Sequence, residues 1–377
     1  MIQSLRSFSF GLSGSIFWVA LAALLFCADA LAGDWYPLQV DVWDPPFNNE
    51  RQRRTATYTP LEKATQRWNI CVSIPHLKDA YWLAANFGLV AEARRLGVNL
   101  VVYEAGGYER IEVQRQQIAE CLSDSFGGQG PDGFILSAVD ADAINDLVTA
   151  MKADGVPVVD LINGINSPDI AGRSAVNYYD LGYRIGEYLL EQHPPAAGPA
   201  KVAWFPGPAG PVWSTDGDNG FQAALAGSHI EIVATRYGDT GKATQTRLIE
   251  AVLDERGEAA ADGGLDYIVG NAPSAEAALS VLRKRGLESD IQVLSYYYGP
   301  GVHQAIKRGV VLAAPTDSPV LLSRLAVDMM TRILEQRPFL QHVAPKVVLV
   351  DRDSLRGWDS SIALAPRGFR ATFSVEQ

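Results

Sequence analysis

Aromatic residues gather at the ends of two strands that the hydropathy pattern predicts to be neighbours. One apolar strand spans residues 69–74 and leads into Tyr81 and Trp82, and another spans residues 98–103 and leads into Tyr108. A helical pattern connects them, so the segment is predicted to form a βαβ unit with both strand ends at one edge of a parallel sheet. Ligands bind in the crevices outside such carboxyl ends. The three aromatic side chains predict a pocket for a small molecule rather than a cradle for phosphate.

Five further residues are candidates for the same pocket. Tyr297 is the middle one of three consecutive tyrosines, of which only one or two can face a cleft because side chains alternate along a strand. Asp317 follows a late strand and could attract a cationic ligand, or it could cap the helix that follows. Trp213, in a predicted loop, could cover the pocket, contact a partner or pack locally. Asp140 and Asn163 end strands at the same edge and are weaker candidates.

The composition and the N-terminus are typical of an exported globular protein. The 377 residues carry a formal net charge of -11, which argues against sequence-independent binding of nucleic acid. Residues 1–32 read as a signal peptide, because Arg6 precedes an apolar run over residues 16–27 and small residues follow at Ala30 and Ala32. The mature protein is therefore expected in the periplasm, without insertion into the membrane.

Two cysteines remain after the signal peptide, and their pairing is open. Cys71 lies in the first predicted strand of this region and Cys121 near the end of a helix in the same half of the chain. An exported protein meets an oxidising compartment, so the two could form a disulfide, or they could be separate buried thiols. Neither a Cys-x-x-Cys motif nor metal-ligand spacing of histidines occurs, so no metal or cofactor is predicted.

Short strands and helices alternate in two successive sets from residue 68 onward. Such alternation is typical of an α/β fold in which parallel sheets are flanked by helices. Two sets predict two similar lobes with a ligand cleft between them. Residues 33–67 read as an irregular N-terminal extension.

This order of elements resembles the type I periplasmic binding proteins, which share the fold of ribose-binding proteins. The resemblance runs from about residue 68 to the C-terminus. Its carriers are the strand, loop and helix over residues 69–97, the strand Gly133-Phe134-Ile135-Leu136, and residues 155–159, 182–186 and 305–309. It implies an N-terminal lobe of residues 68–176 plus 299–335 and a C-terminal lobe of residues 177–298 plus 336–377. The chain is expected to cross between the lobes near Val176, Tyr298 and Glu335.

The chain is more closely similar to the TorT group of that family, the periplasmic sensors of the trimethylamine N-oxide (TMAO) respiratory system. The matching segments are Lys78-Asp79-Ala80-Tyr81-Trp82, Ala91-Glu92-Ala93-Arg94-Arg95, Glu104-Ala105-Gly106-Gly107-Tyr108, Pro206-Gly207-Pro208, Gly368-Phe369-Arg370 and the two cysteine positions. The resemblance implies a sensor of TMAO, or of a related methylated amine or N-oxide, that works with a TorS-type membrane histidine kinase. After the crossover strand the group has a tryptophan wall. This chain has Tyr178 there, which is expected to take its place in a more polar pocket.

Three functions compete at this point. The first is a sensor protein for a kinase, and the second is the solute-binding component of an ABC transporter for a sugar or other small solute. The third is an enzyme, but the sequence contains no nucleophile–base motif, Gly-x-Ser-x-Gly elbow or Gly-rich phosphate loop. No catalytic residue is therefore predicted.

Overall fold

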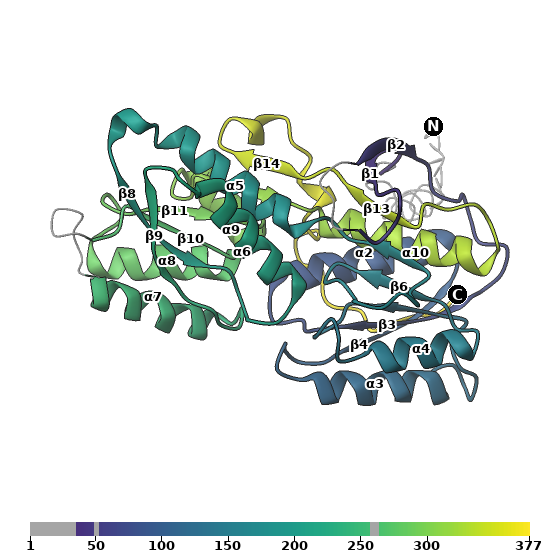
Figure 1. Ribbon diagram of the computed structural model, residues 1–377. Coiled ribbons are helices and arrows are strands. Elements are labelled where there is room, and N and C mark those ends of the chain that lie inside the picture. The colour runs from purple at the N-terminus through teal and green to yellow at the C-terminus, as the bar shows by residue number, and fades with distance from the viewer. Residues whose placement is uncertain (1–34, 49–52, 257–263) are drawn as a thin grey trace, which may run out of the picture.

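Two sheets flanked by helices form two lobes of the computed structural model, which describes residues 35–48, 53–256 and 264–377 (Figure 1). The predicted two-lobed α/β architecture is confirmed. The predicted signal peptide lies outside the described residues. Within the described part of the chain, every helix falls short of the length and apolarity that a membrane span requires.

The larger sheet has nine strands in the order β15-β4-β3-β5-β6-β7-β13-β1-β2. Its strands are β1 (Leu38–Val42), β2 (Arg54–Tyr58), β3 (Asn69–Ile74), β4 (Asn99–Glu104), β5 (Gly133–Leu136), β6 (Val158–Leu161), β7 (Gly172–Ser174), β13 (His342–Pro345) and β15 (Ser374–Val375). The neighbouring strands β4, β3, β5, β6, β7 and β13 of this sheet all pair in parallel. One face is covered by α2 (Ala80–Leu96) and α10 (Pro319–Leu334), and the other by α3 (Ile111–Asp124) and α4 (Asn145–Ala153) (Figure 1).

The smaller sheet is parallel, in the order β11-β10-β8-β9. Its strands are β8 (Ala200–Phe205), β9 (Ile230–Thr235), β10 (Tyr267–Gly270) and β11 (Gln292–Ser295). Its helices are α5 (Tyr178–Gln192), α6 (Val212–Leu225), α7 (Lys242–Arg256), α8 (Ala272–Arg285) and α9 (Pro300–Arg308), with α5 and α6 together on one face and α7 and α8 on the other (Figure 1).

Glycines bring α5 and α6 into direct backbone contact. A Cβ atom added at Gly182 would lie 1.8 Å from the carbonyl oxygen of Gly217, and one added at Gly220 would lie 2.0 Å from that of Tyr179. Any larger residue would push the helices apart. This close packing fixes the relative position of the two helix N-termini, which carry the Tyr178 and Trp213 side chains.

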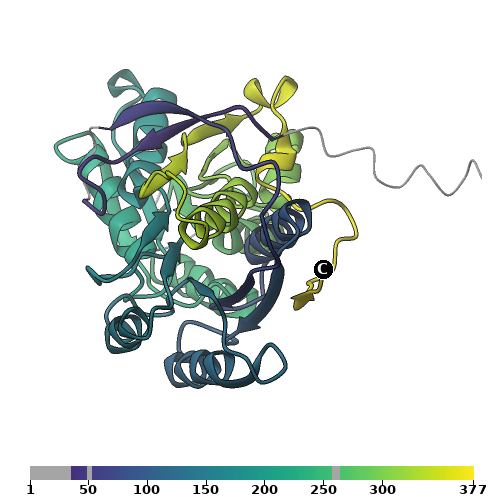
Figure 2. The same cartoon turned by 90° about the vertical axis from the view of Figure 1, so that its right-hand side faces the viewer.

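The two ends of the described chain join the larger sheet, which differs from the predicted organisation. Residues 33–67 read as irregular, but β1 and β2 form an antiparallel hairpin and β1 pairs with β13. Near the C-terminus, β15 pairs antiparallel with β4 (Figure 2). Both β13 and β15 lie within residues 336–377, which the prediction placed in the C-terminal lobe.

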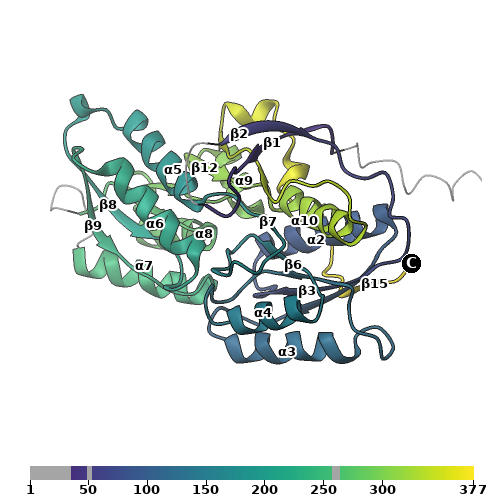
Figure 3. The ribbon, with the colours of Figure 1, turned by 45° about the vertical axis from the view of Figure 1, so that its right-hand side comes forward.

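The return crossing between the lobes also differs from the prediction. It was expected near Tyr298, yet α9 packs on α8 of the smaller lobe and β12 (Ala313–Thr316) lies beside β11 and pairs with β14 (Val348–Asp351). After leaving the larger lobe at α5, the chain returns to it at α10, which lies along α2 (Figure 3). Residues 299–316 therefore belong with the smaller lobe, since their packing partners are there.

Cys71 on β3 and Cys121 on α3 are joined by a disulfide, with their Cα atoms 6.4 Å apart. Both residues are fully buried in the apolar layer between the larger sheet and the helices α3 and α4. The bridge therefore ties a central strand to a covering helix within one lobe.

Candidate functional site

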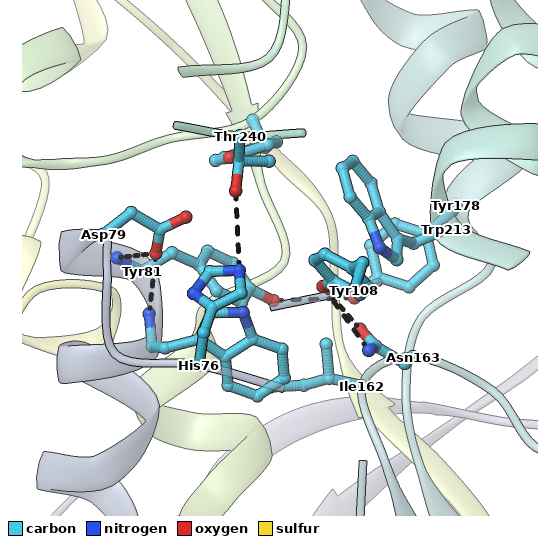
Figure 4. Close-up of a pocket in the computed structure, with 11 residues that line it drawn as sticks. His76, Asp79, Tyr81, Tyr108, Ile162, Asn163, Tyr178, Trp213 and Thr240 are labelled. Carbon is cyan, nitrogen blue, oxygen red and sulfur yellow. Dashed lines mark hydrogen bonds between the residues drawn. The ribbon is translucent and has the colours of Figure 1, made fainter. Parts of the chain in front are cut away.

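A cavity lies between the two lobes, at the carboxyl ends of their parallel strands. It is lined by His76, Asp79, Tyr81, Trp82, Tyr108, Ile162, Asn163, Tyr178, Trp213, Thr240 and Tyr297 (Figure 4). The first seven come from the larger lobe and the last four from the smaller lobe. Its volume is about 30 Å³, which corresponds to roughly two or three water molecules. The site therefore suits a compact solute of a few non-hydrogen atoms.

The start of helix α2 holds two of the aromatic side chains in place. Asp79 is its N-cap, and Asp79 Oδ1 accepts hydrogen bonds from the backbone N–H groups of Tyr81 at 3.1 Å and Trp82 at 3.2 Å. This capping satisfies donors that the first helical turn leaves free. It fixes the turn, so both rings enter the cavity from one rigid element.

Tyr108 reaches the cavity from the turn after β4. Gly106 and Gly107 have φ angles of 87° and 155°, a region that residues with a side chain rarely adopt. The Tyr108 hydroxyl lies 3.4 Å from Nδ2 and 3.5 Å from Oδ1 of Asn163, whose amide also donates to Ala138 O at 2.7 Å. Asn163 thus links the end of β6 to the aromatic wall.

The smaller lobe supplies the opposite aromatic wall. Trp213 lies in the first turn of α6 and is 5% exposed, and its ring centroid is 5.8 Å from that of Tyr108 and 6.1 Å from that of Tyr297. Tyr297 also packs edge-to-face on Tyr81, with centroids 5.5 Å apart. The neighbouring Tyr296 hydroxyl instead donates to a backbone carbonyl. Of the three consecutive tyrosines, only Tyr297 is in the cavity lining, although all three lie after the end of β11 and not within a strand.

Asp317 lies directly behind two of the lining tyrosines. Its Oδ2 accepts the hydroxyl protons of Tyr81 at 2.5 Å and Tyr178 at 3.0 Å. Its Oδ1 has no hydrogen-bond partner among the described residues, although the side chain is only 1% exposed. The alternative role as a helix cap does not apply, because the N-cap of α10 is Ser318.

The ionisable side chains that line the cavity or lie directly behind it are negative or neutral. Burial raises the pKa of both Asp79 and Asp317 to about 6, so both carboxyls are mostly ionised at neutral pH. Burial lowers the pKa of His76 to about 4, so its ring is neutral there. No Lys or Arg is among the lining residues. This field favours a ligand with a positive centre.

Two polar groups in the wall have no partner. Trp213 Nε1 and His76 Nδ1 are buried without a hydrogen bond in the described structure, while His76 Nε2 lies 3.4 Å from Thr240 Oγ1 (Figure 4). A buried donor without a partner is costly, and a ligand that accepts a hydrogen bond would relieve that cost. The cavity therefore combines aromatic faces, carboxylates and an available indole N–H.

An ion pair closes the cleft beside the cavity. Lys78 Nζ, before α2, lies 2.9 Å from Asp239 Oδ2, before α7. Together with the His76–Thr240 contact, it joins the two lobes at the cavity's edge. A larger recess of about 270 Å³ adjoins the cavity here and shares Asp79, Tyr81, Thr240 and Tyr297 with it.

The structure brings together most of the residues predicted for the site. Six of them line the cavity: Tyr81, Trp82, Tyr108, Tyr178, Trp213 and Tyr297. Asp317 lies one layer behind, and Asp140 is not among the lining residues, because its carboxylate accepts the N–H groups of Asp142 and Ala143 in a local turn.

Other lining residues were not predicted. His76, Asp79, Ile162 and Thr240 were missed, and Asn163 was ranked as weak. Asp79 could have been found from its position two residues before an aromatic pair, where an N-cap is expected. Single polar residues in loops, such as His76 and Thr240, leave no pattern in the sequence.

Comparison with known proteins finds relatives over most of the chain. A family model described as a periplasmic binding protein domain matches residues 70–338. The periplasmic protein TorT of Escherichia coli (strain K12) is 34% identical over 84% of this chain and 86% of its own length. The resemblance to the TorT group is thereby confirmed.

Solved structures are similar over comparable lengths. A solute-binding protein of an ABC transporter from Bradyrhizobium sp. BTAi1, with bound bis-tris, is 40% identical, covers 91% of this chain and 99% of its own, and has a TM-score of 0.77. TorT in complex with the TorS sensor domain in the presence of TMAO is 34% identical, covers 81% and 99%, and has a TM-score of 0.71.

Proposed function

This chain belongs to the periplasmic binding protein family and is a relative of TorT, and we propose that it senses a small methylated amine or N-oxide in the periplasm for a TorS-type histidine kinase. The observation that carries the proposal is the aromatic cavity between the lobes. A methylated nitrogen presents a compact positive group, which aromatic faces attract at about 0.5–2 kcal/mol for each well-placed ring. Tyr81, Trp82, Tyr108 and Trp213 supply such faces from both lobes.

The size and polarity of the cavity support this ligand class over a sugar. A pentose has roughly twice as many non-hydrogen atoms as TMAO and would need the lobes to part. Sugar sites also require many donors and acceptors for hydroxyl groups. Here two tyrosine protons are already donated to Asp317, and Trp213 Nε1 is a buried donor without a hydrogen-bond partner among the described residues. TMAO has a single oxide oxygen, which could accept a hydrogen bond from this donor.

The kinase partner is supported by the TorT relative, which has been solved with the TorS sensor domain both without ligand and in the presence of TMAO. In this proposal ligand does not create the complex. It changes the relative stability of lobe arrangements, and the kinase responds only as far as it prefers one arrangement. The protein acts by binding and performs no catalysis.

The test is a titration of the sensor domain of the cognate TorS-type kinase into this protein, with and without TMAO. We expect a complex in both conditions, with an affinity that TMAO changes. The sensor domain should change the TMAO affinity by the same factor, because coupling between binding sites is reciprocal. A protein that binds the solute but never the sensor domain would contradict the sensor role.

A second candidate is the solute-binding component of an ABC transporter. The Bradyrhizobium relative described in those terms supports it. Its bound bis-tris is a hydroxylated tertiary amine, so this candidate shares the chemistry of an amine ligand. Binding of the loaded protein to a cognate permease in membranes, with no binding to the sensor domain, would favour transport.

A further inference from the structure

The two tyrosine hydroxyls at the Asp317 side of the cavity have no proton left for a ligand. A phenol carries a single hydroxyl hydrogen. Tyr81 and Tyr178 both direct it at Asp317 Oδ2, at 2.5 Å and 3.0 Å, while their oxygens are 3.5 Å apart. Both residues line the cavity, and Figure 4 draws their hydroxyls toward each other. Toward a ligand, the two oxygens can therefore only accept.

The Asp317 charge that polarises these hydroxyls is poorly compensated. Its Oδ1 has no partner among the described residues, and its Oδ2 accepts hydrogen bonds from the hydroxyls of Tyr81 and Tyr178. Asp79, the other carboxylate at the cavity, is in a different situation. It accepts two backbone N–H groups at the N-terminus of α2, where the helix dipole offsets part of its charge.

The donor side of the cavity lies on other residues. Trp213 Nε1, on α6 of the smaller lobe, makes no hydrogen bond of ordinary geometry with the described residues, and the side chain closest to it in the cavity wall is that of Tyr108. The cavity thus has an acceptor side at Tyr81 and Tyr178 and a donor at Trp213. A ligand with a positive centre and a separate acceptor oxygen matches both.

We propose that Asp317 is a specificity-determining residue that acts through Tyr81 and Tyr178, and that it makes the site require a positively charged nitrogen. It holds both tyrosine protons and leaves their oxygens electron-rich toward the ligand. Solutes of the same shape with a neutral carbon in place of the nitrogen are therefore rejected. This inference rests on the proposed function and identifies the positive charge on nitrogen as the feature of the ligand that the site selects.

Three probes of similar size separate charge from shape. TMAO has a positive nitrogen and an oxide, tetramethylammonium has the positive nitrogen alone, and tert-butanol has the same outline as TMAO with a neutral centre. Affinities are measured by calorimetry for the first two and by NMR titration of the indole signals for tert-butanol, because that method detects weak binding.

We expect wild-type protein to bind TMAO at least 30-fold more tightly than tert-butanol. Asp317→Asn should weaken TMAO and tetramethylammonium at least tenfold and leave tert-butanol within threefold. Asp140→Asn is the matched control, since that carboxylate caps a turn and does not line the cavity, and it should leave all three affinities unchanged. If Asp317→Asn does not fold, Tyr178→Phe serves instead. It removes one of the polarised oxygens and should lower the TMAO-to-tert-butanol ratio at least threefold.

The inference is overturned if the variant keeps its affinity for both charged probes, or if all three affinities fall by the same factor. The latter result would indicate a merely structural role for Asp317. These outcomes leave the proposed function intact. A wild-type protein that binds neither charged probe would overturn the proposed function and the inference with it.

Discussion

Replacing Trp213 by phenylalanine should separate the two things that this residue offers a ligand. The indole is 5% exposed, its ring centroid is 5.8 Å from that of Tyr108, and its Nε1 has no hydrogen-bond partner in the part of the chain that the structure describes. Phenylalanine keeps an aromatic face in the first turn of α6 and removes the N–H. The variant therefore tests whether the donor is used for the ligand's oxygen.

The expected loss of TMAO affinity follows from the burial of that donor. A hydrogen bond to a charged acceptor contributes about 1.5–3 kcal/mol, which is about 10- to 150-fold in Kd. Trp213→Phe should weaken TMAO by that factor. Tetramethylammonium has no oxygen, so its affinity should change only because a phenyl ring attracts a cation less strongly than an indole does. That change is at most about 1 kcal/mol, or fivefold in Kd.

Calorimetric titration of both ligands into wild type and variant measures this difference. Trp358→Phe is the control, because Trp358 Nε1 is also buried without a partner but packs on Tyr298, outside the cavity lining. It should leave both affinities unchanged. Equal losses of TMAO and tetramethylammonium in Trp213→Phe, or no loss of either, would refute the assignment of Trp213 as the oxide donor.

Three more predictions concern charge and stability. The Cys71–Cys121 disulfide closes a loop with a sequence separation of 50, so reducing it should lower the free energy of unfolding by roughly 4 kcal/mol in the chain-entropy account. Urea denaturation with and without reductant checks this, and a change below about 1 kcal/mol would contradict it. Burial raises the pKa of Asp79 and Asp317 to about 6; because a cation binds the ionised carboxylates, tetramethylammonium affinity should be full well above that pH and fall at pH 5 by about tenfold for each carboxylate that the cation requires. An affinity that is flat from pH 5 to 8 would argue against carboxylate recognition. Lys78→Met removes the ion pair across the cleft and should weaken TMAO by about 1.4- to fivefold at low salt, since exposed pairs contribute about 0.2–1 kcal/mol. The effect should shrink in high salt, as titrations at two ionic strengths would show.

Local sequence patterns are sufficient to predict the larger lobe's part of the cavity. Tyr81 and Trp82 follow an N-cap aspartate at the start of an apolar helix, and Tyr108 follows two glycines at a strand end. Each is placed by its own immediate neighbours in the chain. The βαβ geometry then brings the two strand ends together.

The smaller lobe's part depends on contacts that the sequence does not display. Trp213 was expected in a loop because Gly and Pro residues precede it, but α6 begins at Val212 without a side-chain cap. The packing of α6 on α5 orients it. Thr240 and His76 meet only because the lobes approach each other, so neither stands out in its own segment.

The lobe boundaries show the same limit. The hydropathy pattern predicts strands and helices but not which sheet a strand joins. The N-terminal hairpin joins the larger sheet because β1 pairs with β13, and these two strands are far apart in the sequence. Likewise, β12 has an ordinary strand pattern, and its pairing with β14 decides its lobe.

The central claim is that the cavity between the lobes takes a compact solute with a positive nitrogen. Calorimetry of the purified protein against TMAO, trimethylamine, choline, glycine betaine and ribose tests it most directly. The account predicts one-to-one binding of at least one methylated amine or N-oxide, with TMAO among the tightest, and no binding of ribose. Binding of ribose together with no heat from any methylated nitrogen compound would contradict the account.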